Sequence, residues 1–378
     1  MVRLISLILV CLFVFISNIS VYASSENTEI PDEYKDLIES LPNDIADMLP
    51  EEIFSDNIDE ISKGVQQITS WEYISDTVFD ILGLNVKSIL KVLASIIGLL
   101  VLCSLLNMLK DSIKSTTVEH MLNLISSALI VVLIIQISDE PLERAMALLQ
   151  NIKLFTNTAS PVICAMYAMG GNLTSALVNN YGLIIFLSII ENICIISLES
   201  IVGVCFGLAL ASSFVGETNI LPLSNAIKKA FTFFIGMIML IFTTVMSTQT
   251  LLASKADNLT SKAAKLLASQ IIPLVGGTVG ETLRTAGASI EYLRSNVGIV
   301  LIIALLLLVL PTFISIALYR LGFIISNAFA GLLGCNKEGK LLLEISSIYG
   351  YVLAIISISS IVLLLLITTF AKCASPLK

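Results

Sequence analysis

Charged residues are scarce in this chain of 378 residues. Asp, Glu, Lys and Arg make up 13% of it, 56% is hydrophobic, and the mean hydropathy is +0.94. A water-soluble domain needs a much larger charged fraction to cover its surface. The scarcity of charge therefore excludes a soluble protein and indicates an integral membrane protein.

The residues that build common catalytic and metal sites are also scarce. His120 is the single histidine, and the sequence has no HExxH, CxxC, GxSxG or phosphate-binding-loop motif. The seven cysteines are scattered, mostly in apolar stretches, which predicts small buried side chains. Gly276, Gly277 and Gly280 do not follow a predicted strand, so they are not a dinucleotide-binding fingerprint. We therefore expect no enzyme activity, no metal and no cofactor.

The first 23 residues have the composition of an export signal. A basic residue, Arg3, precedes an apolar run over residues 4–16, and the segment ends in a small residue, Ala23. This pattern predicts a secretory signal peptide cut after Ala23, with an uncleaved membrane anchor as the alternative. In either case the residues that follow are expected to lie outside the cytoplasm.

Residues 24–86 are the acidic part of the protein. They contain 16 Asp or Glu against Lys35 and Lys63. The sequence Leu-Pro-x-acid-Ile occurs twice, at residues 41–45 and 49–53. Proline followed by acidic residues is a helix-start signal, so we predict a small exported segment of about two or three short helices. Its charge should repel nucleic acid and suits docking to another protein.

Residues 87–378 are predicted to form an all-α, polytopic membrane domain. Apolar stretches long enough to cross the membrane occupy residues 88–109, 119–138, 173–214, 231–252, 297–318 and 341–370. Residues 173–214 could form one long helix or two spans, which gives about six or seven spans in total. The positive-inside rule favours two helices, seven spans and a cytoplasmic C-terminus.

Three further segments are predicted to lie at the interface or to re-enter the membrane. Residues 139–155 have apolar positions at helical spacing and should lie along the membrane surface. Residues 159–171 have a proline start and end in two glycines, and are too short to span, so we expect a re-entrant piece or half-helix. Residues 252–296 form the third segment.

The third segment, residues 252–296, is predicted to be an amphipathic helical hairpin. Pro273 ends its first helix, and Gly276 and Gly277 permit the turn into the second. Its charged residues are expected on a wet face, which includes Lys262, Arg284 and Arg294. The hairpin could lie flat on the membrane or line a water-filled path, and the sequence favours the flat arrangement.

Residues 173–214 also contain two carboxylates and two glycines of interest. A charge in hydrocarbon costs about 2.5–3.5 kcal/mol, so Glu191 and Glu199 should face a cavity, a partner or a basic group, or be protonated. The alternative is that they lie in a loop between two spans. Gly203 and Gly207 have a small-xxx-small spacing, which predicts close helix packing.

The order and spacing of several motifs resemble those of the stage III sporulation protein AE family of endospore-forming bacteria. The matching parts are the export signal with its Leu-Pro-x-acid repeat, SPVICAMYAMGGNLTSA, TTVMSTQTLLASKADNLTSKAAK and IIPLVGGTVGETLRTAGASIEYLRSNVGIV. The resemblance implies a non-enzymatic, multi-span subunit of the secretion-like channel complex that joins mother cell and forespore. It also implies a location in the mother-cell membrane around the forespore, and a role in late forespore gene expression.

The resemblance further implies partners: the other stage III A-operon proteins, stage II sporulation protein Q and membrane lipid, in a homo- or hetero-oligomer. A secondary transporter is the competing hypothesis, because the chain combines broken helices with intramembrane carboxylates. Transport by the isolated protein in proteoliposomes would distinguish the two.

Overall fold

The computed structural model describes residues 49–55, 58–112, 116–169, 173–214, 222–238, 240–241, 244 and 276–372. Their elements are η1 (Glu51–Phe54), α4 (Ile58–Ile68), α5 (Trp71–Ser112), α6 (Thr116–Met169), α7 (Leu173–Phe214), α9 (Gly276–Leu332) and α10 (Asn336–Lys372). Residues 222–238 are also helical, and none of the described residues is in a strand.

Five of these helices, α5, α6, α7, α9 and α10, are long and apolar enough to cross a membrane. The protein is therefore an all-α polytopic membrane protein, as its sequence predicts. A sixth predicted span, residues 231–252, begins in the helix at 222–238 and continues outside the described residues. The 54 residues of α6 extend about 81 Å, whereas the hydrocarbon layer is about 30 Å thick. The longer helices therefore continue well beyond the hydrocarbon.

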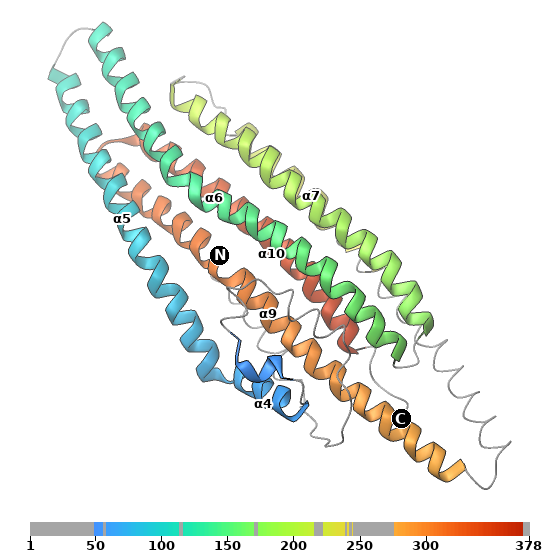
Figure 1. The fold of residues 1–378 in the computed structure, drawn as a ribbon. Helices are drawn as coiled ribbons and strands as arrows, with labels where there is room; N and C mark the ends of the chain where they lie inside the picture. Colours follow the sequence, from blue (N-terminus) through green and yellow to red (C-terminus); the bar gives the residue numbers. More distant parts are fainter. Residues whose placement is uncertain are drawn as a thin grey trace.

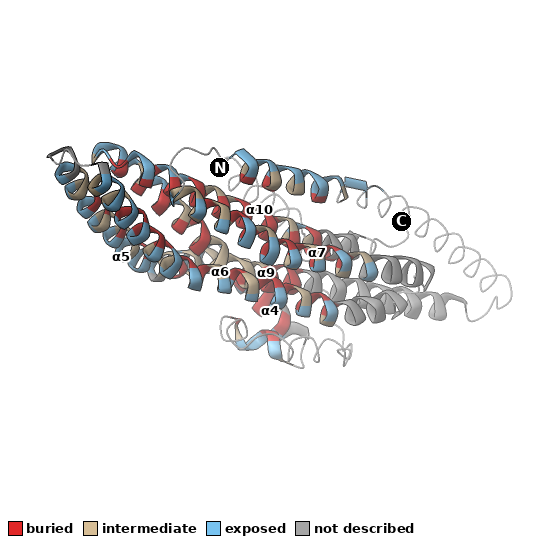
Figure 2. Ribbon diagram, turned by 90° about the horizontal axis from the view of Figure 1, so that it is seen from above, coloured by how far each residue is buried: buried red, intermediate tan, exposed pale blue. Residues whose placement is uncertain are grey.

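Helices α9 and α10 form the centre of the bundle (Figure 1). Helix α10 packs against α9, α7 and α6, and α9 also contacts α4, α5 and α6. In the most apolar stretch of α9, and likewise in that of α10, 61% of the residues are buried. In the corresponding stretch of α5 only 22% are buried. On α5 and α6 many residues of the outer faces are exposed (Figure 2), among them Leu90, Leu102, Leu124 and Val132. Such faces suit contact with lipid.

A tight turn joins α9 to α10. Gly334 has φ 74°, a left-handed conformation that glycine adopts without strain. The amide of Cys335 donates to the carbonyl oxygen of Ala330 at 2.9 Å, and that of Gly334 to Gly331 at 3.4 Å. This is the hydrogen-bond pattern of the Schellman motif, which satisfies the last carbonyls of a helix. Ser104 of α5 donates to the carbonyl oxygen of Leu333 at 2.9 Å and so fixes the turn against α5.

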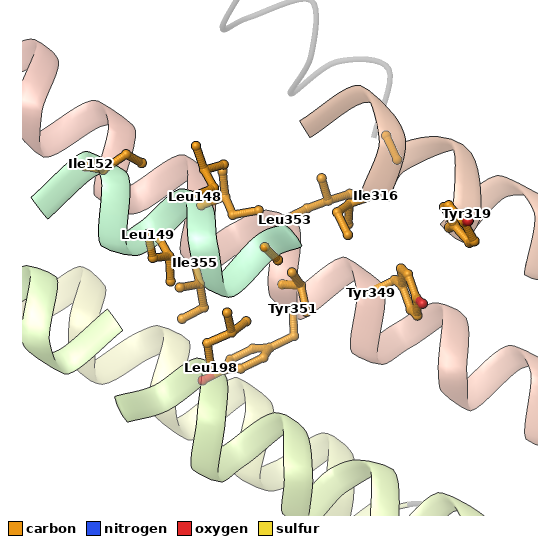
Figure 3. Close-up of a cluster of buried hydrophobic side chains, with 14 of the residues drawn as sticks. Leu148, Leu149, Ile152, Leu198, Ile316, Tyr319, Tyr349, Tyr351, Leu353 and Ile355 are labelled. Atoms are coloured by element: carbon orange, nitrogen blue, oxygen red, sulfur yellow. The ribbon is translucent and has the colours of Figure 1, made fainter. Parts of the chain in front are cut away.

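Helix α6 corrects two predictions. It runs without interruption through residues 139–155, which were expected on the membrane surface, and through residues 159–169, which were expected to be a separate half-helix. The reason is packing: Leu148, Leu149 and Ile152 are buried against α7, α9 and α10 (Figure 3). The apolar stripe therefore faces protein and not the membrane interface.

Helix α7 corrects the prediction of two spans within residues 173–214, because it is one continuous helix of 42 residues. Glu191 and Glu199 both lie inside it and not in a loop. The polar side chains do not interrupt the helix because Glu191 and Ser197 find hydrogen-bond partners on α6 and α10.

Helix α9 extends the second half of the predicted hairpin. It begins at Gly276 and continues past residue 296, through Pro311, to Leu332, so the segment that was predicted to end at 296 belongs to a much longer helix. The first half of the hairpin, residues 252–275, lies outside the described residues.

The N-terminal part of the described chain is helical, as predicted. η1 begins directly after Pro50, in the second Leu-Pro-x-acid sequence. Ile61, Val65 and Ile68 of α4 are buried and pack against the main core. The predicted boundary between residues 86 and 87 falls inside α5. The predicted signal peptide and residues 24–48 of the acidic segment precede the described residues.

Candidate functional site: polar groups inside the helix bundle

A buried ion pair joins the helix at 222–238 to α10. Lys228 Nζ lies 2.7 Å from Glu344 Oε1, and the two side chains are 6% and 5% exposed. Ser224 donates to the same carboxylate oxygen at 2.6 Å, and Lys228 donates to Ser347 Oγ at 2.9 Å. Ser347 in turn donates to Asn225 Oδ1 at 3.2 Å. Both charges are thus compensated and hydrogen-bonded.

The helical repeat explains why these groups meet. Ser224 and Lys228 are four residues apart and Glu344 and Ser347 three apart, so each pair lies on one face of its helix. Removing two charges from water is costly unless each has a partner. We therefore expect this network to fix how the two helices sit against each other.

The sequence pattern also contains a signal for this network. Lys228 lies just before the predicted span 231–252. Glu344 lies near the start of the predicted span 341–370. A carboxylate is as unusual there as Glu191 is within the apolar residues 173–214. Two opposite charges, each inside or beside an apolar stretch, are candidates for pairing.

A groove of about 440 Å³ opens beside the ion pair, between the helix at 222–238 and α10. Lys229, Thr232 and Gly350 are among its lining residues. The guanidinium of Arg320 lies on Gly350: a Cβ at that position would be 2.8 Å from Arg320 Cζ. Arg320 Nε is buried and has no hydrogen-bond partner among the described residues. This side of the bundle is therefore rich in positive charge.

The two predicted carboxylates have different environments. Glu191 is 1% exposed, and its Oε1 is hydrogen-bonded to Thr156 Oγ1 of α6. Its second oxygen, Oε2, is buried and has no partner in the described part of the chain. Glu199 is exposed and lines a groove of about 340 Å³ between α6 and α7, together with Asp139. The structure does not bring Glu191 and Glu199 into one site.

Gly203 and Gly207, whose spacing predicts close helix packing, do not pack closely against another helix within the described residues. Both are exposed, and no atom of the described residues lies within 4 Å of a Cβ built at either position. The packed face of α7 is a different one, on which Val202, Cys205 and Ala209 are buried. Gly203 instead lines the open groove between α6 and α7, and neither glycine is in close contact with another described helix.

The predicted hairpin positions are distributed along α9 where they are described. Gly276 and Gly277 form its first turn, and Arg284 and Arg294 follow within its N-terminal third. Lys262 and Pro273 lie outside the described residues. The predicted wet face of the hairpin stays a prediction.

The turn between α9 and α10 contains a buried thiol. Burial raises the pKa of Cys335 to about 11, and the carboxylate of Glu338 raises it as well. Glu338 is 7% exposed and accepts a hydrogen bond from Ser126 Oγ at 2.5 Å. Cys103, Cys194, Cys205 and Cys335 are all buried and unpaired, which confirms for these four the prediction of small buried side chains. No group of three or more potential metal ligands occurs in the described ranges.

These features define a class: a multi-pass, all-α membrane protein with a compensated charge network in its interior. A family model described as stage III sporulation protein AE matches residues 53–374. The chain therefore belongs to the stage III sporulation protein AE family. It is also similar to stage III sporulation protein AE of Bacillus subtilis (strain 168), with 24% identity over 359 residues, 92% of this chain and 85% of the relative. No solved structure matches the chain.

Proposed function

We propose that this protein is a non-enzymatic membrane subunit of the secretion-like channel complex between mother cell and forespore. Membership of the sporulation family over residues 53–374 is the observation that carries the proposal. The fold is compatible with it, because many of the described polar groups inside the bundle bind one another or helix carbonyls, and the described groups do not form a catalytic arrangement. In this proposal the subunit supports late forespore gene expression.

An in-frame deletion in the source organism tests the role. Cells should grow normally but produce small forespores that lack late gene expression after engulfment, and the intact gene should restore both. Normal spores from the deletion strain would contradict the proposal.

We further propose that the protein works in the mother-cell membrane around the forespore, with the other stage III A-operon proteins and stage II sporulation protein Q. Long helices that continue beyond the hydrocarbon support such contacts, because they provide surface outside the lipid. Cross-linking in sporulating cells, followed by purification through a tag on this chain, should recover these partners. Recovery of the chain alone would contradict a shared complex.

A secondary transporter is the second candidate, and Glu191 is the observation that favours it. Glu191 is 1% exposed, and one of its carboxyl oxygens has no partner among the described residues. Transporters use buried carboxyl groups of this kind to bind coupling ions. Uptake of a labelled solute by proteoliposomes that contain only this protein, abolished by Glu191→Gln, would favour transport. Absence of uptake for a panel of solutes would favour the channel subunit.

A further inference from the structure

Glu191 lies in an apolar part of the interface between α6 and α7. Its neighbours along α7, Leu187, Ile190 and Cys194, are each 1% exposed or less. On α6 the hydroxyl of Thr156 faces it, and Thr156 is itself 2% exposed. A carboxylate in such surroundings needs several donors or a cation to compensate the loss of water.

The hydrogen bonds around Glu191 do not supply these donors. Thr156 Oγ1 is in contact with Glu191 Oε1 and is also 2.9 Å from the carbonyl oxygen of Ile152. A threonine hydroxyl has one proton and can accept through its lone pairs. If that proton bonds to the Ile152 carbonyl, then the contact with Glu191 requires a proton on the carboxyl group. Glu191 Oε2 has no partner in the described bundle.

The charged groups near Glu191 do not neutralise it either. Lys153, on α6, is the nearby cation, but its Nζ donates to Asn192 Oδ1 at 2.8 Å on the exposed side of the interface. The described residues contain no salt bridge to Glu191. The titratable group beside it on α7 is the buried thiol of Cys194. By contrast, buried Glu344 has both Lys228 and Ser224 as donors.

We propose that Glu191 is a proton-binding site: an uncharged carboxylic acid that donates its proton to Thr156 Oγ1, while Thr156 donates its own proton to the Ile152 carbonyl. The bound proton completes the α6–α7 contact. Loss of that proton leaves an uncompensated charge inside the interface, so ionisation requires water to enter between α6 and α7. This property is independent of whether the protein works in a channel complex or as a transporter.

Infrared difference spectroscopy on the purified full-length protein in detergent tests the proposal directly. A protonated carboxyl group gives a carbonyl stretching band that a carboxylate lacks. We expect this band at neutral pH in the parent protein, its loss in Glu191→Gln, and its retention in Glu199→Gln. Glu199 is the matched control, because it lies on the same helix and is exposed. A parent spectrum that equals that of Glu191→Gln in this region would overturn the proposal.

Membrane accumulation gives an independent test that does not depend on spectroscopy. Glutamine is uncharged and can donate to Thr156 Oγ1, so Glu191→Gln should accumulate within about twofold of the parent protein. Alanine removes the donor and leaves a void, so Glu191→Ala should accumulate severalfold less. If Glu191→Gln is lost as severely as Glu191→Ala, then the negative charge itself is needed and the proposal fails.

Discussion

Removing one partner of the Lys228–Glu344 pair should destabilise the protein much more than replacing both. In Lys228→Met the carboxylate of Glu344, which is 5% exposed, keeps Ser224 as a donor but has no cation. Breaking a buried pair in this way costs about 3–5 kcal/mol, because the remaining charge stays buried. Replacing both residues by apolar ones of similar volume is often neutral, or stabilises by about 1–4 kcal/mol.

A double-mutant cycle separates these effects. The variants are Lys228→Met, Glu344→Leu and the double replacement, and the measurement is the free energy of unfolding of each purified protein in detergent. The expected coupling is at least about 3 kcal/mol, which corresponds to more than a hundredfold in the unfolding equilibrium. The surface pair Arg144–Glu140 is the control, because its side chains are 55% and 65% exposed. Its Arg144→Met variant should lose about 0.5 kcal/mol or less.

The reasoning would be refuted if the two single losses added up to the loss of the double variant. Additivity would mean that Lys228 and Glu344 do not interact energetically, despite the distance of 2.7 Å between Nζ and Oε1. A coupling of about 0.5 kcal/mol or less, the size typical of exposed ion pairs, would have the same meaning.

Three further predictions concern α6 and the turn between α9 and α10. Ile152→Ala should cost about 2–5 kcal/mol of unfolding free energy in detergent, because Ile152 is 0% exposed. Leu154→Ala is the control and should cost much less, because Leu154 is 58% exposed. Equal losses would place residues 139–155 outside the core. Gly334→Ala should lower stability by about 1–2 kcal/mol, because alanine is strained at a φ of 74°, and an unchanged midpoint of thermal unfolding would contradict a left-handed conformation at this residue. Because burial raises the pKa of Cys335 from 9.0 to about 11, the unfolded chain loses this proton first as the pH rises. The contribution of Cys335 to stability should thus be constant below pH 9 and be lost between pH 9 and 11, so stability should fall more steeply there than in Cys335→Ser; identical slopes would refute this.

The positions of the spans could be predicted from sequence, but the helix ends could not. Asp139, Glu140 and Pro141 looked like the end of a span, yet α6 continues because later apolar residues such as Leu149 and Ile152 have other helices to pack against. A linear sequence shows where a helix could leave the lipid. It does not show whether protein covers the helix on the far side.

The candidate site was predicted in part. Glu191 could be identified from sequence because a lone carboxylate in an apolar stretch needs an explanation. Lys228 and Glu344 are likewise unusual charges in or beside apolar stretches. That they pair with each other, and that Glu191 contacts Thr156, could not be predicted, since these contacts span 116 and 35 residues of sequence. Only packing determines which of the many possible faces meet. The spacing of Gly203 and Gly207 likewise does not show which face of α7 meets the described helices, because the residues buried there are Val202 and Cys205.

The central position of α9 and α10 has a consequence for biosynthesis. These two helices are translated last, yet together they contact α4, α5, α6 and α7. At roughly 5–20 residues per second, the ribosome needs about 5–20 s to make residues 276–372. During that time the earlier helices have one another but lack the two helices that cover the rest of their inner faces. A nonsense mutation near residue 276 would therefore leave an unassembled set of apolar helices for quality-control proteases, and not a shorter working protein.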